Sequence, residues 1–228
     1  GCADVSVDPQ NPNTVYATTW EFRRLPYLFN SGGSGSGVYK SIDGGITWNT
    51  TGLTFTNTST LASEIFMHPS NPDILWVATS VGLYKTTDAG VTWVQKLGGN
   101  VKDIKLKPGN PDVIYAVTPN RFYRSTNGGD NFTQISSGMP TNSGRLIIDV
   151  TPANPEYVYV LSARTNWSHQ GLYKSTNSGL TFAKTFKRPR CAIPITVPCI
   201  FSSVARLSTL SKIGIADSAP SRPNRFVP

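Results

Sequence analysis

The sequence predicts an all-β chain of repeated four-stranded antiparallel blades, the β-propeller class. An eight-residue turn pattern, the repeated turn, begins at Ser41, Thr86, Ser125 and Ser175. These starts lie 45, 39 and 50 residues apart, close to the roughly 40–50 residues of one propeller blade. A second turn pattern recurs in phase with the first, so the chain should hold about four blades, an incomplete ring.

The repeated turn has a polar middle between an apolar-aromatic strand end and a closing aromatic residue. Asp or Asn at its third position accepts hydrogen bonds from backbone amides, and Gly at its fifth position permits a positive φ. Because Asn127 and Asn177 replace Asp43 and Asp88, we predict a structural role, which excludes a catalytic acid or a metal ligand. The motif residues are Ser41, Asp43, Gly45, Trp48, Thr86, Asp88, Gly90, Trp93, Ser125, Asn127, Gly129, Phe132, Ser175, Asn177, Gly179 and Phe182.

The second pattern is an Asn-Pro pair between two β-rich runs. It begins at Asn11, Asn71, Asn110 and Asn154. Asn-Pro indicates a turn, since proline cannot pair in a following central strand. Each blade is therefore predicted as strand, Asn-Pro turn, strand, connection, strand, repeated turn, strand. Both turns should lie at one end of the blade, and the connections at the other end.

Together the two motifs resemble the Asp-box, or BNR-repeat, β-propellers. The chain looks most like the sortilin-like propellers and the bacterial glycosyl hydrolases with such repeats, which include xyloglucan-hydrolysing enzymes. The resemblance covers residues 1–182 and implies a truncated part of a longer ring, located outside the cell or on its surface. It implies a fold more than a function, because the family hosts enzymes, receptors and scaffolds.

The chain changes character after Phe182, where both turn patterns stop. Residues 1–182 hold 13 Lys/Arg and 12 Asp/Glu, whereas residues 183–228 hold 8 Lys/Arg and only Asp217. We predict a divergent basic tail over 183–228, either frameshifted or disordered, with a genuine terminal segment as the other possibility. Since the net charge of +8 comes mainly from this tail, no nucleic-acid-binding face is predicted.

Composition excludes several further classes. No apolar run reaches about 18 residues, so no membrane span is expected. The three cysteines, Cys2, Cys191 and Cys199, are too few for a disulfide framework and fit no usual zinc spacing. We therefore expect no metal and no cofactor.

Binding is expected at the connection end, because loops carry function on a rigid scaffold. Blade one has an insert over residues 21–36 and blade four over about 164–170, while blades two and three have almost none. Exposed aromatic side chains beside polar groups suit stacking on sugar rings or anchoring a peptide; the alternative is that they only pack their own loops. The candidate ligand-binding residues are Trp20, Glu21, Arg23, Arg24, Tyr27, Phe29, Trp167 and His169.

Two functions remain open from the sequence. The first is a non-catalytic propeller segment of a secreted or cell-surface protein that binds glycans or protein partners through these loops. The second is a fragment of a xyloglucanase-like glycosyl hydrolase whose catalytic acids lie partly outside the fragment. Glycosidases need paired carboxylates across a cleft, and only Glu21 is an obvious candidate in the loops. A sialidase is not expected, because Arg23-Arg24-Leu25-Pro26 has no recognisable catalytic partners.

Overall fold

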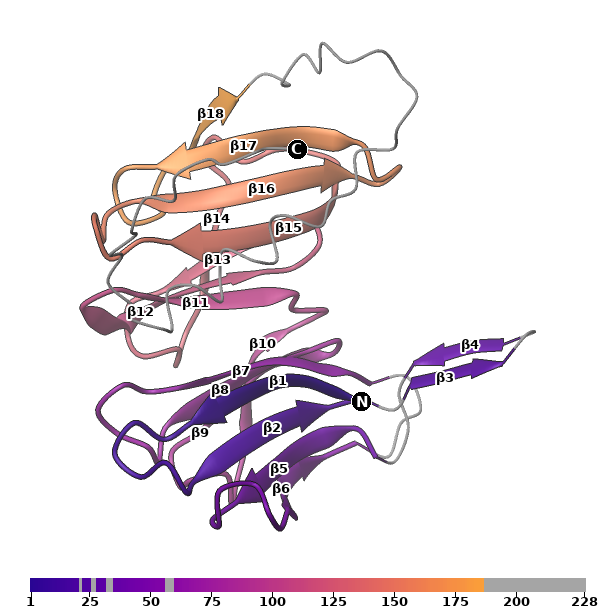
Figure 1. The fold of residues 1–228 in the computed structure, drawn as a ribbon. Coiled ribbons are helices and arrows are strands. Elements are labelled where there is room, and N and C mark those ends of the chain that lie inside the picture. Colours follow the sequence, from indigo (N-terminus) through magenta and orange to yellow (C-terminus); the bar gives the residue numbers. More distant parts are fainter. Residues whose placement is uncertain (21, 26–27, 32–34, 56–59, 187–228) are drawn as a thin grey trace, which may run out of the picture. The chain divides into compact units, whose positions relative to one another are not determined.

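The computed structural model describes residues 1–20, 22–25, 28–31, 35–55 and 60–186. The described chain is all-β, and its main part is four separate four-stranded antiparallel sheets (Figure 1). The predicted order of strands is confirmed in each blade. The blades are β1 (Cys2–Val7), β2 (Val15–Thr19), β5 (Gly37–Ser41) and β6 (Asn49–Thr54); β7 (Ala62–Met67), β8 (Leu75–Thr79), β9 (Gly82–Thr86) and β10 (Val94–Gly98); β11 (Asp103–Lys107), β12 (Asn110–Val117), β13 (Phe122–Ser125) and β14 (Thr133–Ile135); β15 (Ser143–Val150), β16 (Val158–Arg164), β17 (His169–Ser175) and β18 (Ala183–Phe186). The Asn-Pro pair lies in the first turn of blades one, two and four, whereas in blade three Asn110-Pro111 begins β12.

The first-blade insert contains a hairpin that the sequence did not predict. Strands β3 (Phe22–Leu25) and β4 (Leu28–Ser31) pair only with each other, as a separate two-stranded sheet. Blade four ends at Phe186, four residues past the expected boundary, because its closing aromatic residue precedes the outer strand as Trp93 precedes β10. The remaining tail, 187–228, lies outside the described residues.

The two turns of each blade are hydrogen-bonded to each other, which confirms that they share one end. In every blade, the fourth residue of the repeated turn donates its N–H to the carbonyl of the residue that follows Asn-Pro. The four pairs are Gly44 to Asn13 (2.9 Å), Ala89 to Asp73 (3.0 Å), Gly128 to Asp112 (2.9 Å) and Ser178 to Glu156 (2.9 Å). In blade three the hairpin is tighter than expected, because Gly109 with φ +76° closes it immediately before Asn110.

Inside the repeated turn, Asp and Asn occupy equivalent positions and accept equivalent hydrogen bonds. The side chains of Asp43 and Asp88 accept the amides of Thr47 and Thr92, at 2.9 and 2.8 Å. Asn127 and Asn177 accept the amides of Asn131 and Thr181, both at 3.0 Å. Where the closing residue is tryptophan, its indole N–H also donates to the fifth-residue carbonyl, at 2.9 Å in Trp48 and 3.0 Å in Trp93. Hydrogen bonds among its own residues therefore close each repeated turn.

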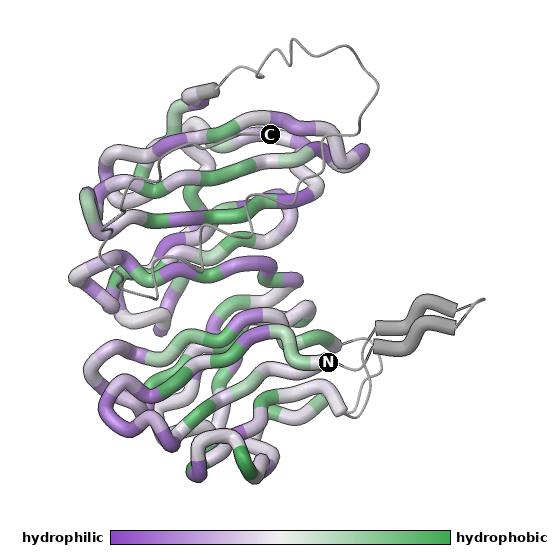
Figure 2. Tube along the Cα trace, viewed as in Figure 1, coloured by the Kyte–Doolittle hydropathy of each residue, from purple (hydrophilic) through white to green (hydrophobic). Residues whose placement is uncertain are grey.

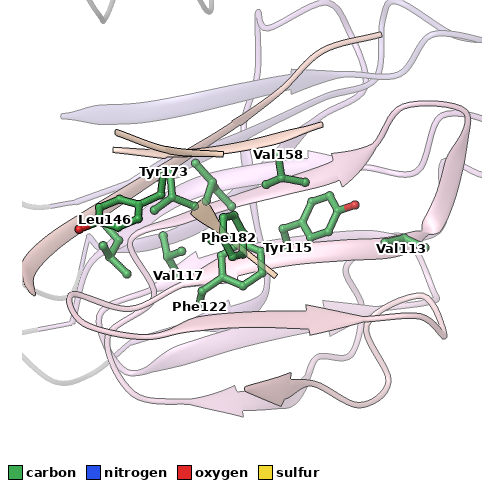
Figure 3. Packing of buried hydrophobic residues seen from close by; sticks show 10 residues of the cluster. Val113, Tyr115, Val117, Phe122, Leu146, Val158, Tyr173 and Phe182 are labelled. Atoms are coloured by element: carbon green, nitrogen blue, oxygen red, sulfur yellow. The ribbon is translucent and has the colours of Figure 1, made fainter. Parts of the chain in front are cut away.

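The hydrophobic core lies between successive blades. We call the face of a blade that meets the blade before it in sequence its leading face, and the opposite face its trailing face. Three buried clusters fill the three junctions between blades, and the apolar residues concentrate along the strands (Figure 2). At the last junction, the Phe122 ring of blade three meets the Phe182 ring of blade four edge-on, with centroids 4.8 Å apart (Figure 3). Each blade thus depends on a neighbour for burial.

The fold predicts that Gly129, the fifth residue of the third repeated turn, is required both for its backbone conformation and for lack of space. Gly129 has φ +79°, and a Cβ there would lie 2.7 Å from Trp76 Nε1 in the preceding blade. Gly99 has φ +93° with open space around it, so it is the matched control for conformational strain alone. Gly99→Ala should cost about 1–2 kcal/mol, and Gly129→Ala about 1–3 kcal/mol more because of the clash. Urea unfolding measures both, and equal losses would contradict the expected close contact.

A second prediction concerns acid stability. Hydrogen bonds from Thr47 and Ser41 lower the pKa of Asp43 to about 2, and those from Thr86 and Thr92 do the same for Asp88. A carboxyl whose pKa is lowered by folding adds stability above its unfolded value, about 3.8, and loses it as pH falls towards 2. The double variant Asp43→Asn/Asp88→Asn should therefore stay folded near pH 7 and lose stability less steeply below pH 4. Urea unfolding midpoints between pH 7 and 2 are compared for the wild type, the double variant and the control Asp149→Asn. If the midpoint fell equally steeply with pH in all three proteins, the predicted contribution of Asp43 and Asp88 would be wrong.

Candidate functional site

The connection between β16 and β17 is a short turn fixed by its own hydrogen bonds. The amide of Arg164 donates to the carbonyl of Ser168, and the amide of Trp167 donates to the carbonyl of Arg164, both at 2.9 Å. Asn166 Oδ1 accepts the Ser168 amide at 3.1 Å and the Ser168 hydroxyl at 2.7 Å. This side chain replaces a backbone partner, as Asn does in turns. The loop therefore presents its side chains from a defined backbone.

Trp167 is the prominent side chain of this loop. Its backbone has φ +64°, a left-handed conformation that costs a non-glycine residue about 1–2 kcal/mol. Its side chain nevertheless stays 71% exposed, so burial of the indole does not offset that cost. A large aromatic residue held in an unfavourable backbone conformation and left in solvent is typical of a functional position.

A polar cluster joins the two strands on either side of this loop, β16 and β17, to the neighbouring strand β15. Gln170 Oε1 accepts the hydroxyls of Ser143, at 3.1 Å, and Ser162, at 2.9 Å. Gln170 Nε2 donates to the carbonyl of Thr141 at 2.6 Å. His169, the residue before Gln170, has a buried Nδ1 with no hydrogen-bond partner, and such a group costs about 1–3 kcal/mol. Trp167 and His169 were predicted from the sequence, whereas the serines and Gln170 were not, because their role depends on a contact between β15, β16 and β17.

The other predicted site residues belong to blade one. Trp20 is half-buried directly after β2, and its carbonyl accepts the Gly1 ammonium at 2.7 Å. Arg23 and Arg24 lie on β3 and Phe29 lies on β4; their side chains lie outside the described part of the structure. Glu21 and Tyr27 also lie outside the described residues. The structure thus brings Trp167 and His169 together on blade four, and Trp20 lies on blade one.

A pocket of about 540 Å³ lies on the leading face of blade one. Trp20 is one of its aromatic lining residues, with Tyr39 and Trp48. The latter two stand at the same blade positions as Tyr84 and Trp93, which pack into the junction between blades one and two. The full lining is Gly1, Cys2, Val5, Ala17, Thr19, Trp20, Gly35, Tyr39 and Trp48. The pocket is therefore part of a blade-packing face, and it is a different place from the blade-four loop.

We call the first strand of each blade (β1, β7, β11 and β15) its inner strand. Carboxylates on the inner strands of blades one to three join each of these blades to the next, which was not predicted from the sequence. Inner strands leave backbone amides unpaired at their free edge. The Ile65 amide of blade two donates to Asp4 Oδ2 of blade one at 3.1 Å. The same bond joins the Ile104 amide to Glu64 Oε2 at 2.9 Å, and the Ile148 amide to Asp103 Oδ2 at 2.8 Å. The signal is an acid directly before the same apolar position in three blades; blade four has Ile147 there.

Lys105 lies between two of these carboxylates. Its ammonium contacts Glu64 Oε1 and Asp103 Oδ1, both at 2.6 Å. Burial alone would lower the pKa of Lys105, but the two carboxylates outweigh burial and raise it to about 12. Burial and the neighbouring Asp103 raise the pKa of Glu64, against the effect of Lys105. This group is engaged in joining blades two, three and four.

The repeated turn also contacts the preceding blade. The carbonyl of its fourth residue accepts a hydrogen bond from a side chain of that blade at every described junction. The three bonds are Tyr16 Oη to Ala89 O (3.0 Å), Trp76 Nε1 to Gly128 O (3.1 Å) and Arg124 Nε to Ser178 O (2.8 Å). At the middle junction, Lys85 also reaches Asp130 at 3.2 Å. The repeated turn is thus part of the interface between blades.

No group of three or more His, Cys, Asp or Glu side chains in the described part is arranged to hold a metal ion. Within the same residues, no helix has the length and apolar character needed to cross a membrane.

Comparison with solved structures gives the same architecture. An ancestral GH74 enzyme matches with a TM-score of 0.64 at 23% identity, over 82% of this chain and 24% of that one. The GH74 xyloglucanase from Xanthomonas campestris matches with a TM-score of 0.59 at 13% identity, over 85% and 32%. YCF48 from Cyanidioschyzon merolae matches with a TM-score of 0.52 at 16% identity, over 83% and 57%. No family model matches the chain, and neither does any curated protein.

These likenesses show the β-propeller fold, and the chain spans about a quarter to a third of the GH74 proteins that it matches.

The inner carboxylates predict a stability effect. Asp103→Ala removes the acceptor of the Ile148 amide and one of the two partners of Lys105. Leaving these donors poorly satisfied should cost about 2–4 kcal/mol. Asp149→Ala, on the next inner strand but exposed, should change the free energy of unfolding by less than about 0.5 kcal/mol. Urea unfolding compares the two, and similar losses would mean that the carboxylate does not join the blades.

Proposed function

We propose that this chain is a non-catalytic segment of a β-propeller that binds polysaccharide through the blade-four loop. The observation that carries the proposal is Trp167, held at φ +64° by a hydrogen-bonded turn and 71% exposed. An indole fixed in this way offers an apolar surface without ordering a flexible loop on binding, which lowers the entropic cost of association.

The surroundings of Trp167 support a sugar ligand. A sugar ring has an apolar C–H face for the indole and hydroxyls for polar neighbours, and binding sites commonly combine an aromatic surface with a few placed polar groups. The hydroxyl of Ser168 and the side chain of Asn166 lie in the same turn, and Arg164 begins it. A protein ligand is the other occupant considered from the sequence, and it would use the same exposed indole.

The non-catalytic part of the proposal is supported by the positions of the acids. The buried and half-buried inner-strand carboxylates bind backbone amides of neighbouring blades. Asp43 and Asp88 bind within their own turns, at the end of the blade opposite the connections. A paired general acid and nucleophile, or acid and base, is therefore not available among these residues.

The alternative is a fragment of a glycosyl hydrolase. It is favoured by the fold shared with two GH74 enzymes, one of them named a xyloglucanase. In that case Glu21 would act together with acids elsewhere in a longer protein. Polysaccharide binding and polysaccharide hydrolysis would both place the protein outside the cell or on its surface, where such polysaccharides occur.

The test uses xyloglucan as the probe, with affinity electrophoresis of the purified chain. The wild type should be retarded, and Trp167→Ala should weaken binding at least tenfold, whereas Trp167→Phe should keep most of it. Trp167→Gly should also lose binding without a lower melting temperature, because glycine adopts positive φ freely. Val91→Ala is the matched control, since Val91 is also 71% exposed but lies in the repeated turn at the opposite end.

Two results would overturn the proposal. One is wild-type retardation that Trp167→Ala leaves unchanged; the other is no retardation by xyloglucan or any other polysaccharide on a glycan array. Release of reducing ends from xyloglucan that is lost in Glu21→Gln would replace the binding function by the glycosidase alternative.

A further inference from the structure

The leading face of blade one has the composition of a packed interface. In blades two to four, the leading-face positions are apolar and pack on the preceding blade. In blade one the same positions remain open: Val5, Val7 and Trp48 are 42%, 50% and 40% exposed. Val5 and Trp48 also line the 540 Å³ pocket described above. The corresponding sets are Val5, Val7, Ala17, Tyr39 and Trp48; Ile65, Met67, Val77, Tyr84 and Trp93; Ile104, Leu106, Ala116, Tyr123 and Phe132; Ile148, Val150, Val160, Tyr173 and Phe182.

The open face also presents the two backbone groups that form the bonds between blades. Val5 pairs with Ala17 as Ile65 pairs with Val77, Ile104 with Ala116 and Ile148 with Val160. The Val5 amide therefore points to the sheet edge at which the amides of Ile65, Ile104 and Ile148 donate to a carboxylate. Gly44 is the fourth residue of the first repeated turn, and its carbonyl corresponds to those of Ala89, Gly128 and Ser178. One donor and one acceptor thus accompany the apolar surface.

We propose that the leading face of blade one binds a further four-stranded blade of defined chemistry. This partner blade carries a carboxylate on its inner strand, which accepts the Val5 amide. On its middle strands it carries a tyrosine, tryptophan or arginine, which donates to the Gly44 carbonyl. These side chains, together with the rest of its trailing face, fill the pocket between Val5, Tyr39 and Trp48.

The carboxylate requirement excludes one source of such a blade, namely blade four of a second copy of this chain. Blade four of a second copy of this chain has Tyr159 and Leu172 at the trailing-face positions of Tyr115 and Phe122. However, it has Ile147 at the position held by Asp4, Glu64 and Asp103 in the other blades. It would leave the Val5 amide facing a hydrocarbon side chain, and an unsatisfied buried amide is costly. The partner is therefore a blade with an acid at this position, and self-association through blade four is excluded.

The experiment adds such a blade to the full chain. A copy of residues 101–143 is fused directly before Gly1, which places the copied Asp103 at the same sequence separation from Val5 as Asp103 from Ile148. The matched control carries Asp103→Ile in the copied blade only, the residue that blade four has. Hydrogen exchange of the segments around Val5 and Gly44, read by mass spectrometry, is compared with the unfused chain. Sedimentation velocity of the unfused chain reports self-association.

The Asp-bearing fusion should slow exchange at Val5 at least tenfold, and the Asp103→Ile fusion should slow it much less. The unfused chain should sediment as a monomer, and its Val5 exchange should not depend on concentration. Three outcomes would overturn the proposal: equal protection in both fusions, no protection in either although the added blade is itself protected, or a dimer of the unfused chain that protects Val5.

Discussion

The constraint on which the structure depends is that no blade buries its apolar residues alone. A four-stranded sheet has two faces, and both faces of the inner blades are apolar, so the core exists only where one blade meets the next. The three buried clusters lie at these junctions, with Tyr115 and Phe122 on one side and Phe182 on the other at the last of them. Stability is therefore largely a sum of junctions, as in other repeat proteins. Every other repeated feature of the chain acts at a junction.

The polar contacts show how apolar faces are held in register. Packing alone specifies area but not alignment, because hydrophobic contact is non-directional. The inner-strand carboxylates and the donors to the repeated-turn carbonyls fix one blade against the next at two separate points. Asp103 shows what such a contact requires. Burying its carboxylate is unfavourable, and the ion pair with Lys105 and the hydrogen bond from the Ile148 amide compensate for it. The repeated turn is thus both a hairpin closure and a docking element, which explains why it tolerates Asn for Asp but keeps its glycine.

The candidate binding site has a different physical basis. It lies at the connection end, where loop length and composition vary between blades without disturbing the junctions. Trp167 and Asn166 belong to a turn that is stabilised by its own hydrogen bonds. The bonds of Arg164 and Ser168 hold Trp167 in its unfavourable backbone conformation. Ser143, Ser162 and Gln170 tie this turn to the inner strand of its blade.

The sequence by itself determined the fold class, the blade count and the strand order, because turn chemistry is local. Asn154-Pro155 and Ser175 to Phe182 report their turns without reference to any distant residue. Trp167 was also predictable as a site candidate, as an aromatic residue in an inserted loop. Only the tertiary structure decided that Asp4, Glu64 and Asp103 join blades, that Trp20 borders the blade-one pocket, and that the insert holds the β3–β4 hairpin. The carboxylates bind amides 40 to 61 positions away, the pocket joins residues from several strands, and the hairpin has no turn signature. One segment of the sequence does not show which distant residues it contacts.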